Sequence, residues 1–213
     1  MPTPASPRPA RTRNPRGEGG RLRDDILAAA TELLDESGDE GSVTLRSIAR
    51  RAGVAAPSIY RHFPDQPSIM LAVVRQAFAM LDAELRGALD AAGDDARGRL
   101  FAFCDAYLDF AERYPGRYRT MFGGVWMPDL GGGSVTEDDV SSLGGESMTL
   151  LAGALDDCVR AGCATSDDTA ADAVALWLGL HGLAHQRLVT VAFPWPADIA
   201  ERLVTALAHL VRP

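Results

Sequence analysis

The chain has 213 residues, of which 46% are hydrophobic, and carries a formal net charge of −8. This size and apolar content suffice for one large or two small folded domains, and exclude a disordered chain, a collagen-like repeat and a disulfide scaffold. Its three cysteines, an odd number, favour a reducing compartment. Residues 1–25 lack the apolar stretch of a signal peptide, and the longest uncharged apolar stretch, 173–186, is shorter than the ~18 residues of a membrane span. We therefore expect a cytoplasmic protein with no membrane partner.

The charge is distributed unevenly along the chain. All 21 basic residues are arginines; residues 1–63 hold ten of them with eight acidic residues, whereas residues 64–213 hold eleven with 21 acidic residues. An anionic partner would therefore meet the N-terminal part, because the local field matters more than the total charge.

The residue pattern predicts helices separated by breaks, in chain order. Residues 1–20, rich in Pro, Arg and Gly, predict a disordered basic arm. Apolar spacing, caps and Pro or Gly breaks then predict helices over 21–37, 45–51, 57–63, 67–89, 96–113, 117–122, 141–161, 168–191 and 197–211. A glycine-rich connection spans 123–145, with a helical start near Glu137. We predict an all-α fold with an N-terminal domain at 21–66 and a C-terminal helical bundle at 67–213.

Residues 44–70, TLRSIARRAGVAAPSIYRHFPDQPSIM, have the spacing of a helix-turn-helix. Ile48 is expected to pack inward from the first helix, and Val54 and Ile59 to fill the space between the two helices. Gly53 falls in the turn, where a positive φ is easiest for glycine. The second helix would then present its outer face to a DNA major groove.

This stretch resembles the DNA-binding domain of the TetR (tetracycline-repressor) family of bacterial regulators. The run Tyr60-Arg61-His62-Phe63, followed by Pro64-Asp65, is its most specific part. Residues 117–122 (RYRTMF) and 177–182 (WLGLHG) resemble a subgroup of the family with a Trp…His-Gly motif. The resemblance implies a homodimer whose C-terminal domain binds a small ligand, and in which ligand binding moves the long fourth helix and releases DNA.

The resemblance also implies roles for individual residues. Thr44 would bind a phosphate at the N-terminus of the second helix, and Tyr60 and His62 would contact phosphates. Arg46 and Arg61 would reach a phosphate or a guanine edge.

The remaining DNA contacts would come from the start of the recognition helix. Ala55, Ala56 and Pro57 would offer apolar contact to thymine methyl groups, and Ser58 also faces outward. Gln66 stands where many relatives carry Lys, so we expect the salt dependence of DNA binding to be shallower by about one ion. The arginine-rich arm could compensate in the minor groove.

Aromatic and methionine side chains in the middle of the chain predict an apolar ligand cavity in the C-terminal domain. The expected lining residues are Phe103, Tyr107, Phe110, Met121, Phe122, Trp126, Met148, Trp177 and His181. Because few of these side chains are charged, we expect a small hydrophobic or aromatic ligand. The apolar helices at 168–191 and 197–211 predict a homodimer through a four-helix bundle, and hence a palindromic operator on double-stranded DNA.

Two other classes of function remain open. A helix-turn-helix protein could bind DNA constitutively, or sense redox state or a metal through its cysteines or the His181/His185 pair. An enzyme could use the C-terminal pocket, although no nucleophile–base pair has supporting spacing, and Gly182 stands where a zinc peptidase needs Glu. We predict a ligand-responsive repressor with no catalytic residue, metal or cofactor.

Overall fold

The computed structural model describes residues 18–124, 126, 128, 130 and 133–211. Most of the predicted basic arm, residues 1–17, lies outside this part of the chain. The described residues form helices and no strand, apart from an isolated bridge between Ala164 and Leu210. The predicted all-α class is confirmed. Within the same described part, no helix combines the length and the apolar character needed to cross a bilayer.

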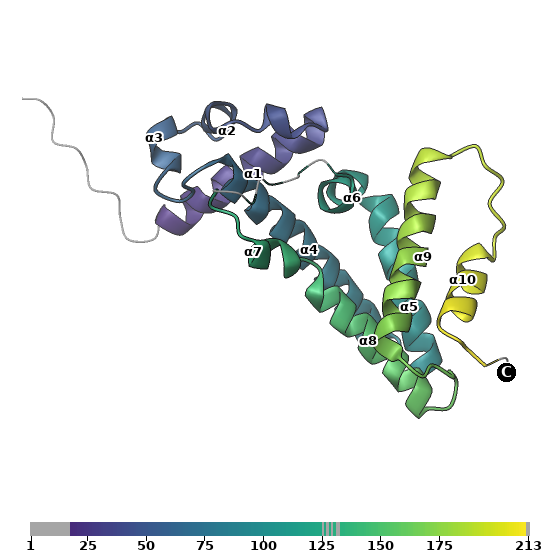
Figure 1. The fold of residues 1–213 in the computed structure, drawn as a ribbon. Coiled ribbons are helices and arrows are strands. Elements are labelled where there is room, and N and C mark those ends of the chain that lie inside the picture. The colour runs from purple at the N-terminus through teal and green to yellow at the C-terminus, as the bar shows by residue number, and fades with distance from the viewer. Residues whose placement is uncertain (1–17, 125, 127, 129, 131–132, 212–213) are drawn as a thin grey trace, which may run out of the picture.

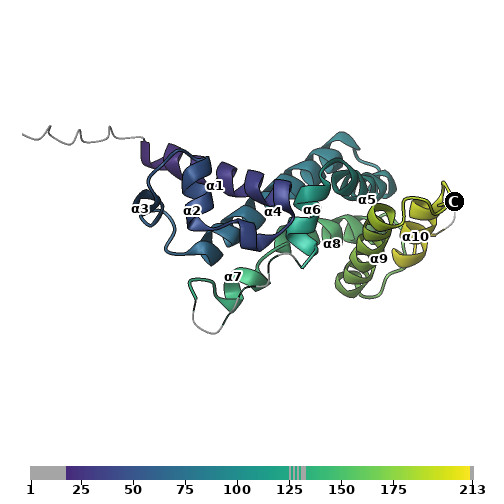
Figure 2. The same ribbon diagram turned by 90° about the horizontal axis from the view of Figure 1, so that it is seen from above.

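An N-terminal helical unit lies at one end of an elongated molecule (Figure 1, Figure 2). Its elements are α1 (Glu18–Ser37), the short 3-10 helix η1 (Glu40–Ser42), α2 (Leu45–Arg51) and α3 (Ala56–Ile59). Ile26, Ile48 and Ile59 are completely buried, which explains the apolar spacing of the sequence. The three helices therefore share one core with the start of the next helix.

The long helix α4 (Gln66–Ala91) connects this unit to the rest of the molecule, as Figure 1 shows. Its first half packs Ile69 and Val73 into the N-terminal core, whereas its second half packs Leu81 and Leu85 into a separate C-terminal core. The predicted domain boundary between residues 66 and 67 thus falls in the first turn of a helix that both cores share.

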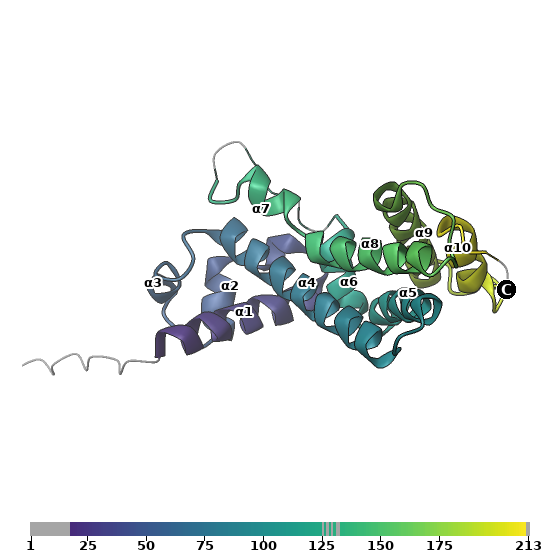
Figure 3. The ribbon, with the colours of Figure 1, turned by 90° about the horizontal axis from the view of Figure 1, so that it is seen from below.

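The C-terminal bundle is built from the remaining helices, which are α5 (Ala96–Arg113), α6 (Pro115–Phe122), α7 (Glu137–Ser141), α8 (Gly145–Arg160), α9 (Thr169–Val189) and α10 (Ile199–Leu207). α8 packs beside α4 and α5, and α9 and α10 lie together at the far end of the molecule (Figure 3). A Cβ at Gly179 would stand 2.5 Å from Cδ1 of Leu207, so this glycine allows α10 to approach α9 closely.

Several helix ends differ from the predicted ones. α3 ends at Ile59 rather than 63, because the next residues turn, with His62 N–H and Phe63 N–H both donating to the Ile59 carbonyl. α8 begins at Gly145 rather than 141, after Gly144 takes a left-handed conformation with φ of 74°. α10 ends at Leu207 rather than 211, since the chain reverses at His209 (φ 49°).

Candidate DNA interface and ligand cavity

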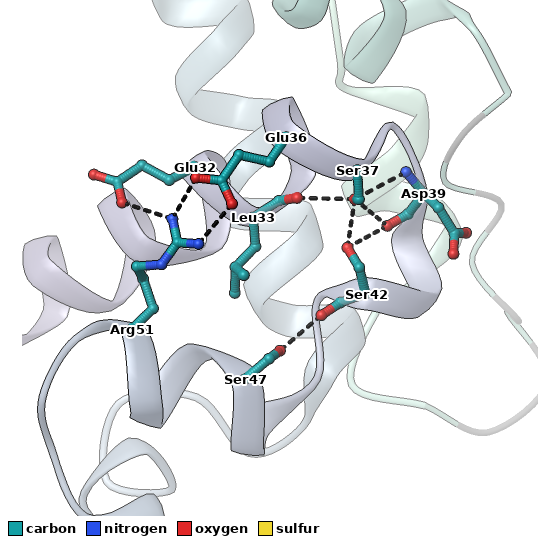
Figure 4. A network of polar contacts seen from close by, with 8 residues as sticks. All are labelled: Glu32, Leu33, Glu36, Ser37, Asp39, Ser42, Ser47 and Arg51. Carbon is teal, nitrogen blue, oxygen red and sulfur yellow. Dashed lines mark hydrogen bonds and ion pairs between the residues drawn. The ribbon is translucent and has the colours of Figure 1, made fainter.

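Thr44 begins α2 through a capping box. Its hydroxyl oxygen accepts a hydrogen bond from the Ser47 backbone N–H at 3.1 Å, and Ser47 Oγ accepts from the Thr44 N–H at 2.9 Å. Ser47 Oγ also lies 2.7 Å from the Ser42 carbonyl oxygen, a contact drawn in Figure 4. Thr44 is exposed but its side chain already fixes the helix start, so any phosphate contact would be added to this capping role.

Arg51 fastens α2 to α1 (Figure 4). Its Nη2 donates to Glu36 Oε2 at 2.6 Å and its Nη1 to Glu36 Oε1 at 2.9 Å, while Nη1 also donates to Glu32 Oε2 at 3.1 Å. The hydrogen bond from Arg51 lowers the pKa of Glu36. The sequence analysis does not predict this ion pair. Glu32 and Glu36 are four residues apart, so they share one face of α1 and can both bind one arginine.

The residues predicted to contact DNA lie in α2, in α3 and in the cap and turn residues beside them. Arg46, Ala55, Pro57, Tyr60 and Arg61 are exposed, whereas Ala56, Ser58 and His62 are partly buried. Gly53 has a φ of 68° in the turn between the helices, as the sequence predicts.

The charge of this surface comes from arginines without acidic partners. Within the described residues, Arg46, Arg50 and Arg61 form no ion pair, in contrast to Arg51. Gln66 does not add to this charged surface. Its Nε2 donates a hydrogen bond to the Glu40 carbonyl oxygen at 3.2 Å, which joins α4 to η1. The outer face of the helix pair is therefore positively charged in an acidic protein.

A cavity of about 310 Å³ lies between α4 and α9. Its walls are mostly apolar and include five of the predicted residues, namely Tyr107, Met121, Phe122, Met148 and Trp177. The remaining lining residues are Phe78, Leu81, Val140, Leu143, Gly144 and Ser147. The predicted site missed Val140 and Leu143, because nothing in a glycine-rich connection indicates that the short helix α7 folds back over the cavity.

The other predicted lining residues lie elsewhere. Phe103 and Phe110 are buried in the C-terminal core and do not line this cavity. Trp126 packs with the N-terminal core instead. His181 lies behind the cavity wall, where its ring stacks on Trp177 with centroids 5.5 Å apart.

His181 belongs to a cluster of aromatic rings. Tyr118 Oη lies 2.7 Å from His181 Nδ1, and Tyr107 Oη lies 3.4 Å from the same nitrogen. Burial, with a smaller contribution from the charge of His185, lowers the pKa of His181. The imidazole is therefore neutral at neutral pH, and both Tyr118 and Tyr107 have a pKa raised by burial.

Residues 134–148, here called the covering segment, carry α7 and the start of α8 over the cavity. Polar contacts join this segment to α4 at Asp65–Ser134, Arg75–Asp139, Asp82–Ser147 and Arg86–Glu146. Val135 adds an apolar anchor, because it is buried in the N-terminal core. One segment thus touches both the cavity and the N-terminal unit.

Two of the three cysteines, Cys104 and Cys158, are buried. Burial raises the pKa of Cys158 to about 12 and also raises the pKa of Cys104, so both thiols are protonated at neutral pH and poorly reactive. Among the residues that the structure describes, no group of three His, Cys, Asp or Glu side chains is placed to hold a metal ion.

Two family profiles match the chain. One, described as "Bacterial regulatory proteins, tetR family", matches residues 26–73, and the other, "Tetracyclin repressor-like, C-terminal domain", matches residues 100–210. A solved structure of a protein of unknown function from Rhodococcus sp. RHA1 is similar, with 28% identity and a TM-score of 0.71 over 88% of this chain and 91% of that one.

Curated relatives match over shorter regions. The transcriptional activator FasR of Mycolicibacterium smegmatis is 35% identical over 100 residues, which are 47% of this chain and 45% of FasR. The nucleoid occlusion factor SlmA of Aliivibrio fischeri is 29% identical over 105 residues, or 49% of this chain and 53% of SlmA. The chain thus spans about half the length of the curated relatives it matches. Because the C-terminal profile alone covers more than half of the chain and the N-terminal profile covers the helix-turn-helix, the chain belongs to the TetR family of bacterial regulatory proteins.

Proposed function

We propose that this protein is a homodimeric repressor in the cytoplasm, which binds a palindromic DNA operator and leaves it when a small hydrophobic or aromatic ligand fills the cavity of the C-terminal bundle. One observation carries this proposal. α4 begins directly after the predicted DNA-contacting residues and lines the ligand cavity with Phe78 and Leu81 further along the same helix. Since the family is one of regulatory proteins, we propose no enzymatic activity.

The exposed surface of α2 and α3 supports DNA binding. Arg46 and Arg61 are long and charged and have no acidic partner among the described residues, so they suit phosphate oxygens or the N7 and O6 acceptors of guanine. Thr44, Tyr60 and His62 flank them with polar groups for the phosphate backbone. Ala55, Ala56, Pro57 and Ser58 form a small, mostly apolar start of the recognition helix, which suits close approach to base edges and thymine methyl groups.

The walls of the cavity support a ligand without charge. Tyr107, Phe122 and Trp177 supply aromatic surface, and Met121 and Met148 supply adaptable apolar side chains. A cavity of about 310 Å³ has room for a molecule of one or two rings or a short acyl chain.

The exposed face of α9 supports a dimer through the helices predicted at 168–191 and 197–211. Val174 is 46% exposed and Leu178 is 55% exposed, one turn apart on the same face. Pairing α9 and α10 with a second copy would cover these side chains in a four-helix bundle. A twofold dimer would place two recognition helices about one DNA turn apart, roughly 34–36 Å, and so select a palindrome.

Release of DNA follows if the ligand binds one arrangement of α4 better than the other. A ligand between Phe78 and the covering segment would push against α4, whose first residues support the recognition helix. The covering segment offers a second connection, because it lines the cavity at Val140 and contacts Asp65 through Ser134. DNA would then bind the other arrangement, in which the two recognition helices have the operator spacing.

Selection from randomised DNA duplexes at near-physiological salt tests this proposal. The purified protein, with any co-purified ligand removed by unfolding and refolding, is expected to enrich a palindromic sequence. The enriched duplex then serves as a probe for compounds that release it. A folded, dimeric sample that enriches no sequence would contradict the proposal, and enrichment of an asymmetric half-site would contradict the dimeric arrangement.

A further inference from the structure

A second cavity, of about 410 Å³, lies between α6 and the C-terminal end of α9. Its apolar lining comes from Phe122, Leu188 and Val189, and its polar lining from Tyr118, Arg119, His181 and His185. Phe122 also lines the ligand cavity described above, so its ring separates the two spaces. Val174 and Leu178, on which the proposed dimer rests, lie earlier on α9 and do not line this cavity.

Among the described residues, the ionisable lining of this second cavity is basic or neutral. No Asp or Glu of the described part of the chain lines it, although the whole chain carries 29 acidic residues and a net charge of −8. Arg119 is exposed and forms no ion pair within the described residues, whereas Arg117 on the same helix pairs with Asp35 and Arg187 on α9 pairs with Glu112. The guanidinium of Arg119 is therefore available to an anion from outside the chain.

The hydrogen bonds of His181 add a donor to this site. Its Nδ1 lies 2.7 Å from the Tyr118 hydroxyl oxygen, which also lies 3.3 Å from the His181 carbonyl oxygen. When Nδ1 of the neutral ring accepts a hydrogen bond from the Tyr118 hydroxyl, the hydrogen of the ring is carried on Nε2. His181 then offers an N–H donor, and exposed His185 stands one helical turn further along α9.

The rings around the cavity favour a flat apolar body. Tyr118 and Phe122 stand with ring centroids 5.1 Å apart, and Phe122 and His181 with centroids 5.0 Å apart. Aromatic surfaces of this kind bind other rings by offset or edge-to-face contact. An arginine beside them can donate two parallel hydrogen bonds to a carboxylate, which a point charge cannot do.

We propose that the cavity between α6 and α9 is a second binding site, which takes a planar aromatic carboxylate. Arg119 holds the carboxylate with help from His185, and the ring packs against Phe122, Leu188 and Val189. This site is distinct from the apolar ligand cavity of the proposed function and does not depend on it.

Calorimetric titration with 1-naphthoate and its neutral analogue 1-naphthamide tests this site on the full chain. We expect 1-naphthoate to bind at least ~10-fold more tightly than 1-naphthamide, because only the carboxylate forms charge-assisted hydrogen bonds. Arg119→Gln is expected to abolish that difference, whereas Arg160→Gln, an exposed arginine on α8 outside the cavity, is expected to keep it. Both substituted side chains are exposed, so circular dichroism should show unchanged folding.

Further variants separate the two cavities. Met148→Trp, or Val140→Phe if the first variant unfolds, narrows the apolar cavity without touching the second site, and is expected to leave 1-naphthoate binding in place. Loss of 1-naphthoate binding in such a folded variant would put the carboxylate in the apolar cavity and overturn the proposal. Equal binding of both probes, no effect of Arg119→Gln, or equally tight binding of inorganic phosphate would overturn it as well.

Discussion

The hydroxyl of Ser134 donates a hydrogen bond of 2.6 Å to Oδ1 of Asp65, the residue that caps α4. The same Oδ1 accepts from the Ser68 backbone N–H at 3.0 Å. One carboxylate oxygen therefore joins the start of α4, just after the predicted DNA-contacting residues, to the segment that covers the apolar cavity.

The charge of Asp65 should stabilise the fold at neutral pH. Burial opposes ionisation of Asp65, but hydrogen bonds from Ser134 and Ser68 outweigh it and lower the pKa. A pKa lowered on folding contributes stability above the unfolded pKa, and this contribution is lost as the pH falls through the folded pKa. We expect Asp65→Asn, which keeps a good N-cap, to lower the free energy of unfolding by about 1 kcal/mol at pH 7.

Urea denaturation at several pH values checks this expectation. The difference between Asp65→Asn and the wild type should shrink below about pH 3.9, the ordinary pKa of an Asp side chain. Ser134→Ala should cause a smaller loss of stability, with the same dependence on pH. Ser141→Ala should cause no such pH-dependent loss, because the Ser141 hydroxyl contacts only a local carbonyl oxygen. A difference that stays constant with pH would show that the carboxylate charge has no part in it.

Arg61 provides the sharpest test of the DNA interface. If it reads a base, Arg61→Ala should lose ~1–3 kcal/mol of specific binding and relax the preference at one operator position. Fluorescence anisotropy with the selected duplex and with point-substituted duplexes measures both effects. Arg160→Ala, on the far side of the bundle, serves as the matched control. An equal loss on all DNA sequences would instead make Arg61 a phosphate contact.

Gly144, unlike the adjacent Gly145, should tolerate no larger residue without a loss of stability and a change in the cavity wall. Gly144 has a φ of 74°, and a Cβ there would stand 2.9 Å from Cε1 of Phe78. Gly144→Ala should therefore cost about 1–2 kcal/mol of stability and weaken binding of the neutral apolar probe N-phenyl-1-naphthylamine. Gly145→Ala is the control, since a Cβ at this helical position meets nothing within 4 Å. Similar behaviour of the two variants in thermal melts and probe titrations would argue against this account of the cavity wall.

Leu178 tests the proposed dimer face. Leu178→Glu would place a charge in the centre of the pairing surface, so light scattering after size-exclusion chromatography should show a monomer at micromolar concentration. Leu130→Glu alters another exposed leucine that is not part of α9 and should leave the dimer intact. If the dimer survives Leu178→Glu, the two copies must meet through another surface.

The helices of this protein could be predicted well from the sequence because local signals define them. Gly53 lies in the turn where the spacing of apolar residues requires a break. Helix ends were less accurate where a tertiary contact decides them. α10 stops early because the chain reverses at His209 and pairs with residues after α8, as in the hydrogen bond from Val211 N–H to the Cys163 carbonyl.

The composition of the ligand cavity could be predicted only in part. Of the residues expected from aromatic content, Tyr107, Phe122 and Trp177 line the cavity. Buried rings such as Phe103 look the same in a sequence whether they line a cavity or fill a core. Trp126 illustrates the limit, since its position depends on a long-range return of the chain to the N-terminal core. The roles of Gln66 and Arg51 depend likewise on partners distant in the sequence.

Because α4 is long, a small rotation of this helix at the cavity would displace its N-terminus by a larger distance. Phe78 in the cavity wall stands 13 residues (78 − 65) after the cap Asp65, a span of roughly 20 Å along the helix axis. Pivoting the helix by about 5° at its cavity end would displace the cap by about 2 Å, and a symmetric dimer would double the change in separation between its two ends. Under the proposed function, a ligand that tilts α4 by such a small angle would change the distance between the two DNA-binding units of the dimer.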